Sequence, residues 1–185
     1  GNPGSTERML TVSQLETQRD LTIPVAQLQR SELRGRLIQF SGENAEHKRI
    51  ATDPLTNLEN SYKVFFGRQF VLNDRAFMDA KRAQEAELRA KVGANAQLAA
   101  EIGDPWGEIA KAQTAAAEHF VRYRQLEQAA GGGSSLFNYA RDLVRAAVER
   151  AKPAAERLPA YADTRLPLLQ KTLLDERPVD APLEE

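Results

Sequence analysis

Cysteine is absent from this chain of 185 residues, and histidine occurs only twice. Without cysteine the chain can form no disulfide, no thiolate zinc site and no cysteine nucleophile. The absence fits a cytosolic protein and a cysteine-poor periplasmic protein equally well. Neither His47 nor His119 has a partner at metal-binding spacing. We therefore interpret both as surface or helix-face histidines and expect no metal and no other cofactor.

The chain also lacks an excess of one charge and any long apolar run. Lysine and arginine total 25 against 26 aspartates and glutamates, so no net field attracts nucleic acid or an anionic membrane. No stretch approaches the roughly 18 apolar residues that a membrane span needs, and no signal sequence is present in the chain. The sequence predicts a soluble protein that binds no nucleic acid and has no membrane span.

What the sequence does contain favours helices throughout. Alanine, leucine, glutamate, glutamine and arginine dominate, and alternating runs of β-branched residues are missing. The longest candidate strand, VFFGRQFVL, has its apolar residues in clusters rather than at every second position. We predict an all-α fold, and the length fits one elongated domain.

Capping residues predict where the first helices begin. Thr11 followed by Gln14 forms a capping box for a helix over residues 12–21. Pro24 suits the first turn of a second helix that ends before SGEN, with a short corner between the two. Asp53-Pro54 repeats the start signal, and from there no proline interrupts the chain to about Lys91.

The helix after Pro54 is predicted to be long and to bend only at Gly67. If unbroken to Lys91, it runs about 55 Å. Asp104-Pro105 starts another long helix, which ends at the glycines of GGGSS. An alanine-rich segment joins these two long helices, so we predict that they form an antiparallel hairpin.

The last third of the chain predicts shorter helices. Ser135 can cap a helix with a wide apolar stripe, which Lys152-Pro153 stops. Short helices interrupted by Pro159 and Pro167 are predicted after it. The last segment, DERPVDAPLEE, is predicted to be a polar, proline-containing tail.

Motifs for catalysis are missing. No Gly-x-Ser-x-Gly elbow occurs, and the serines lie mainly at caps and corners. GGGSS has no preceding strand and no Gly-Lys-Ser/Thr ending, so a connector between helices explains it better than a phosphate loop. The sequence predicts that no reaction is catalysed within this chain.

The stretch NLENSYKVFFGR contains the candidate binding residues. Asn57 and Asn60 are mediocre helix formers beside an aromatic cluster. Both could bond to solvent or to neighbouring backbone. Alternatively, one amide could project from a rigid helix and accept a hydrogen bond from a ligand ammonium. Spacing alone leaves both interpretations open.

Four stretches resemble the helical domain of the dipeptidyl-peptidase 7 and 11 family of serine peptidases, serine peptidase family 46. They are GNPGSTERMLTVSQLETQRDLTIP, NLENSYKVFFG, GGSSLFNYARDLVR and AERLPAYADTRLPLL, and together they span nearly the whole chain. The resemblance implies a chymotrypsin-like double β-barrel that carries a Ser-His-Asp triad outside this chain, with an all-α domain inserted into it. It implies an enzyme that removes dipeptides from the free N-terminus of oligopeptides without a metal.

The resemblance also implies a role for each part of the chain. Residues 1–10 would be a loop from the missing catalytic domain, residues 11–174 a helical cap over the active site, and residues 175–185 an extended tail. Asn60 would bind the substrate's terminal ammonium, with Asn57 as the alternative. The parent enzyme would be periplasmic or secreted, could be a homodimer, and would contact its oligopeptide substrate partly through this domain. A stand-alone helical scaffold or adaptor that binds protein partners is the alternative function.

Overall fold

The computed structural model describes residues 9–129 and 134–174. Every regular element in these ranges is a helix and none is a strand, which confirms the all-α prediction. The chain divides into two compact units between Val121 and Arg122. The predicted tail at 175–185, most of the predicted loop at 1–10 and the glycines at 131–133 lie outside the described residues.

The first helical segment runs from α1, Val12–Thr17, into α2, Ile23–Glu43. Its start confirms the capping box, since Thr11 Oγ1 accepts from Gln14 N–H and the Gln14 side chain accepts from Thr11 N–H. The predicted corner before Pro24 is wrong. A π-helical turn, Gln18–Thr22, joins the two helices, and Ile23 N–H donates to Gln18 O. Proline lacks an N–H and clashes with the carbonyl four residues back, and the wider π turn accommodates it.

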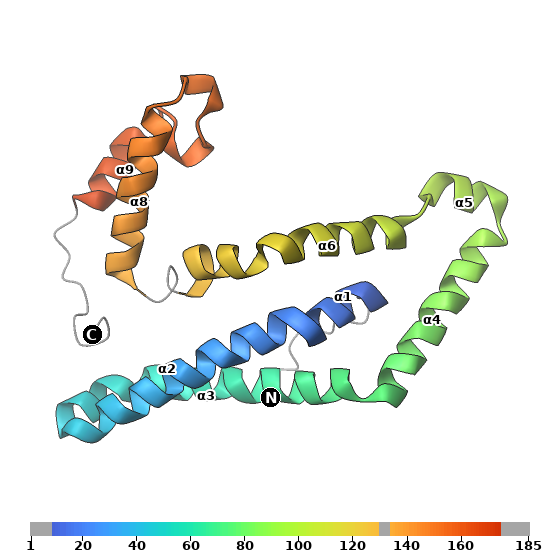
Figure 1. The fold of residues 1–185 in the computed structure, drawn as a ribbon, viewed down its shortest axis with the longest axis horizontal. Helices are drawn as coiled ribbons and strands as arrows, with labels where there is room; N and C mark the ends of the chain where they lie inside the picture. Colours follow the sequence, from blue (N-terminus) through green and yellow to red (C-terminus); the bar gives the residue numbers. More distant parts are fainter. Residues whose placement is uncertain (1–8, 130–133, 175–185) are drawn as a thin grey trace. The chain divides into compact units, whose positions relative to one another are not determined.

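Helix α3, Ala45–Asn73, returns antiparallel along α2 (Figure 1). It begins earlier than predicted, because the side chain of Asn44 caps the helix by accepting from His47 N–H at 2.9 Å. Pro54 lies inside the helix, so Asp53-Pro54 does not start it. The antiparallel pairing of α2 with α3 was not predicted from the sequence.

The predicted unbroken helix to Lys91 is wrong as well. Asp74 adopts extended backbone angles, φ −71° and ψ 116°, and separates α3 from α4, Arg75–Gly93. Its carboxylate accepts from Ala76 N–H and Phe77 N–H, at 2.8 and 3.3 Å. The chain bends at this capping aspartate, and Gly67 lies within the continuous α3.

The core of the first unit lies where α1, the start of α2, α3 and α4 meet. Its buried residues are Leu15, Ile23, Leu72 and Met78, and three half-buried residues pack against them: Leu10, Phe65 and Phe77. Not every apolar residue of α2 faces inward, since Leu28 is 73% exposed while Ala26 is buried.

The first unit continues through α5, Ala96–Ile102, into α6, Pro105–Tyr123, and ends at Val121 within α6. The predicted start of α6 is confirmed, because Asp104 Oδ1 accepts from Gly107 N–H at 3.0 Å. Helices α4 and α6 do not pack along each other, so the hairpin predicted for them is wrong. Arg89 of α4 reaches Trp106 of α6, with its guanidinium carbon 5.2 Å from the ring centroid.

The second unit contains a π-helical turn, Arg124–Ala129, then α8, Ser135–Arg150, two 3₁₀ turns, Ala154–Glu156 and Pro159–Tyr161, and α9, Leu166–Leu173. The prediction of Ser135 as the cap of α8 is wrong by one residue, since Ser134 Oγ accepts from Phe137 N–H. The predicted stop near Lys152-Pro153 is confirmed. The apolar stripe of α8 is solvent-facing, with Leu136, Leu143, Val144 and Val148 all exposed.

Candidate functional site on the outer face of α3

Asn57 and Asn60 both lie in the middle of α3, and both side chains are exposed. Neither amide bonds to another residue in the described part of the chain. Because the two residues are three apart on a helix, their side chains share one face. An exposed amide on a helix offers one carbonyl oxygen and one NH₂ group to a ligand.

The opposite face of α3 is held against α2 and the π-helical turn before it. Ala51 is fully buried there. Gln69 Nε2 donates to Arg19 O at 2.9 Å, and the guanidinium carbon of Arg30 lies 4.0 Å from the ring centroid of Phe65. These contacts fix the rotation of α3 about its axis. Packing of the inner face therefore holds the face that carries Asn60 away from α2.

A continuous stripe follows that outer face, with spacings that alternate between four and three residues. This pattern keeps side chains on one face of a helix. We call it the outer stripe; its residues are Asp53, Asn57, Asn60, Val64, Gly67 and Val71.

The outer stripe changes in polarity along the helix. It begins with the carboxylate of Asp53, which forms no ion pair with another described residue. Two amides follow, and then two exposed valines, Val64 at 59% and Val71 at 43%, with Gly67 between them. The stripe therefore offers an acidic end, a hydrogen-bonding centre and an apolar end to whatever lies against it.

Gly67 has no packing reason to be a glycine. A Cβ built on it would meet nothing within 4 Å, and its backbone is helical. A glycine inside a helix costs about 0.5–1 kcal/mol relative to alanine. Gly35 and Gly42 in α2 have equally open surroundings, so the openness at Gly67 does not distinguish it from them.

A comparison with known families shows which family the chain belongs to. A family model described as Peptidase S46 matches residues 1–185. The chain belongs to the peptidase S46 family. Comparison with curated proteins and with solved structures found no match. The family predicted from the four sequence stretches is thereby confirmed.

The two histidines of this S46 chain occupy helix surfaces, as predicted. His47 Nδ1 lies 2.9 Å from Glu43 Oε2, and its ring stacks on Phe40 with the centroids 4.0 Å apart. His119 is exposed on α6. In residues 9–129 and 134–174 no three His, Asp or Glu side chains come together as a metal site, and no helix is long and apolar enough to cross a membrane.

A cluster of ion pairs lies in the second unit of this S46 chain. Glu127 pairs with Arg145 and with Arg141, and the hydrogen bond from Arg145 lowers the pKa of the Glu127 carboxyl. Burial raises the pKa of the nearby Tyr161. Arg141 Nη1 also donates to Leu126 O at 2.9 Å. These contacts tie the π-helical turn to α8, so we assign the cluster a structural role.

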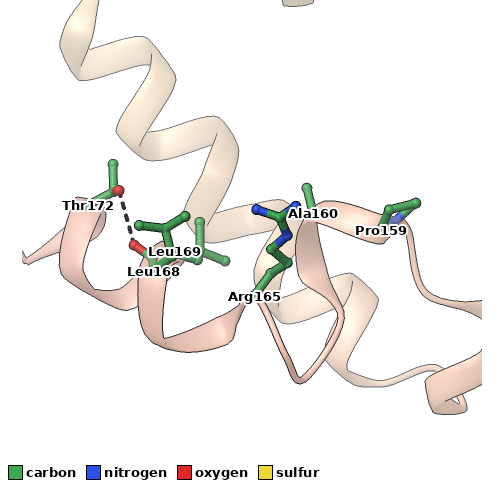
Figure 2. A pocket seen from close by; sticks show the side chains of 6 residues that line it. All are labelled: Pro159, Ala160, Arg165, Leu168, Leu169 and Thr172. Carbon is green, nitrogen blue, oxygen red and sulfur yellow. Dashed lines mark hydrogen bonds between the residues drawn. The ribbon is translucent and has the colours of Figure 1, made fainter.

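A groove in the second unit has a volume of about 420 Å³. Figure 2 shows its lining, which is Pro159, Ala160, Arg165, Leu168, Leu169 and Thr172. Thr172 Oγ1 donates to Leu168 O at 3.1 Å and so stays within its own helix. Arg165 is the only titratable side chain of the lining. A single cation beside apolar side chains does not provide an acid and base for catalysis.

The sequence indicates the two amides of the outer stripe but not its other members. Its local patterns indicate a helix start at Asp53, a bend at Gly67 and an apolar cluster at Val64. The alternating spacing of four and three residues around Asn60 was the signal that could have united them.

Proposed function

We propose that this S46 chain is the substrate-gating helical domain of a serine dipeptidyl-peptidase, which releases dipeptides from the free N-terminus of oligopeptides. The match to the family supports the peptidase context. The observation that carries the specific role is Asn60, an exposed amide without a partner in the described chain, on a helix face that packing holds outward.

Asn60 suits the recognition of a terminal ammonium. Its amide oxygen can accept from an N–H⁺ group, and a hydrogen bond to a charged group is stronger than a neutral one. Because Gln69 and Arg30 fix the inner face of α3, the amide is positioned before the substrate arrives. Asn57, one turn earlier, is the alternative.

The domain gates the substrate by supplying a contact that only a chain terminus can make. A helical cap also forms a wall that stops a peptide from extending past its first residue. The Ser-His-Asp triad lies in the β-barrel domain of the complete enzyme, and closure of the cap over the substrate excludes water from it. The enzyme is periplasmic or secreted and acts as a homodimer. This chain alone releases no dipeptides.

The test is the steady-state kinetics of Asn60→Ala in the complete enzyme with dipeptidyl substrates. The loss of the contact should lower kcat/KM by about 1–3 kcal/mol, a 5- to 150-fold loss, with a raised KM. Asn57→Ala removes the same amide from the same face and decides between the two candidates. A loss in Asn57→Ala alone would move the role to Asn57, and no loss in either variant would refute the assignment.

A further inference from the structure

We propose that Asn60 is positioned by a bond between α3 and the π-helical turn, which Gln69 donates and which Pro24 makes available. This inference rests on the proposed function, because it takes Asn60 as the contact for the ammonium. Gln69 is a positioning residue in this account, since it acts through the rotation of α3 and does not touch the substrate.

The carbonyl of Arg19 lacks both donors that its own helix could supply. In an α-helix its donor would be the N–H four residues on, at Ile23, and in a π-helix the N–H five residues on, at Pro24. Ile23 N–H donates to Gln18 O instead, and proline has no N–H. The π-helical turn and Pro24 together therefore leave one backbone acceptor for another part of the fold.

Gln69 of α3 bonds to this carbonyl. Its Nε2 donates to Arg19 O at 2.9 Å, and the residue is half-buried. Its Oε1 is buried and accepts from no residue in the described part of the chain, so the donated bond is what the amide contributes to the interface. A buried carbonyl without a donor is destabilising. Rotations of α3 that withdraw Gln69 from Arg19 O are therefore disfavoured.

Gln69 lies on the face of α3 opposite to Asn60. The two residues are nine apart on one continuous helix, which corresponds to about two and a half turns and about 13 Å along the axis. A rotation of α3 by about 15° would move a side-chain atom about 6 Å from the axis by roughly 1.5 Å. A displacement of that size is enough to weaken a binding contact and to slow the reaction.

Gln69→Met tests the positioning, because methionine keeps the length of the side chain and removes the donor. It also removes the buried Oε1, so the fold should be retained, which circular dichroism checks. In the complete enzyme we expect kcat/KM to fall about tenfold for a dipeptidyl substrate and to change little for its desamino analogue, which lacks the ammonium. A purely structural role would lower kcat/KM for both substrates alike.

Gln27→Met is the matched control in the same interface. Gln27 Nε2 donates to Tyr62 O at 3.3 Å, but this carbonyl lies inside the continuous α3, where the helix supplies a donor of its own. The control loses the same side-chain amide without leaving a carbonyl unpaired. It should therefore leave kcat/KM for both substrates nearly unchanged.

Pro24→Ala tests why the carbonyl of Arg19 is available. Alanine restores an N–H that can donate to Arg19 O from within the same helix and that competes with Gln69. We expect kcat/KM for the ammonium substrate to fall in Pro24→Ala. The double variant with Gln69→Met should fall no further than Gln69→Met alone, because both changes remove one bond.

The inference is overturned if Gln69→Met keeps full kcat/KM or loses it equally for both substrates, if Gln27→Met matches it, or if the losses of Pro24→Ala and Gln69→Met add. Asn60→Ala, measured on the same pair of substrates, separates this failure from that of the proposed function. An ammonium-dependent loss with Asn60→Ala but none with Gln69→Met refutes only the positioning. No loss with Asn60→Ala refutes the ammonium contact, and the positioning with it.

Discussion

Val12 N–H donates to Glu85 Oε2 at 2.6 Å, which joins the start of α1 to the middle of α4. The first N–H groups of a helix have no partner within it. Thr11 satisfies the N–H of Gln14, and Glu85 satisfies that of Val12 from a distant helix. This bond crosses the junction where Leu15, Leu72 and Met78 pack, so it helps to hold α4 beside the start of the domain.

Glu85→Ala should lower the free energy of unfolding by about 1–2 kcal/mol, because it leaves Val12 N–H without its acceptor in a half-buried place. Glu85→Gln keeps an acceptor oxygen and should lose less. Glu87→Ala is the matched control, since Glu87 pairs only with Lys91 on the surface of the same helix. Urea unfolding and hydrogen exchange at Val12 measure the effect. Equal losses at Glu85 and Glu87 would contradict the assigned role.

Asp74→Ala should destabilise the junction of α3 and α4 by about 1 kcal/mol, because Ala76 N–H and Phe77 N–H lose their acceptor. Asp74→Asn should retain most of the stability, since asparagine caps helices about as well as aspartate. The helical content and the melting temperature of the three proteins check this. If Asp74→Asn were as unstable as Asp74→Ala, charge and not capping would be the cause.

The Glu127 cluster predicts a loss of stability in acid. The hydrogen bond from Arg145 lowers the pKa of Glu127 from its ordinary value of 4.5. A carboxyl whose pKa is lowered by folding stabilises the native state above its unfolded pKa, and that contribution is lost as the pH falls through the native pKa. Between pH 6 and 3, the unfolding free energy should therefore fall more steeply in the natural chain than in Glu127→Gln. Parallel curves would show that the ion pair contributes nothing.

Local signals in the sequence predicted local structure well. Thr11 with Gln14, and Asp104 before Pro105, act within one helical turn, and both caps form as predicted. The helix start predicted at Asp53-Pro54 is wrong, because the helix already begins after its cap at Asn44. An established helix can continue through one proline. The helix break at Asn73-Asp74 was not predicted, although aspartate is a strong N-cap.

The packing of α3 on α2 and on the π-helical turn before it could not be predicted, because polar side chains make many of the contacts. Gln27 Nε2 donates to Tyr62 O at 3.3 Å, Gln69 reaches Arg19 O, and Arg30 lies over Phe65. The spacing of hydrophobic residues in the sequence does not reveal an interface made by polar side chains. The sequence therefore placed Asn60 on a helix but could not tell which way that helix faces.

The central claim is that Asn60 binds the substrate's ammonium, and a cycle of paired changes tests it most directly. The measurement is kcat/KM of the complete enzyme and of Asn60→Ala, each with a dipeptidyl substrate and with its desamino analogue, which lacks the ammonium. We predict a loss of about 1–3 kcal/mol for Asn60→Ala with the ammonium substrate and almost none with the analogue. Equal losses with both substrates would contradict the account, because Asn60 would then act without the ammonium.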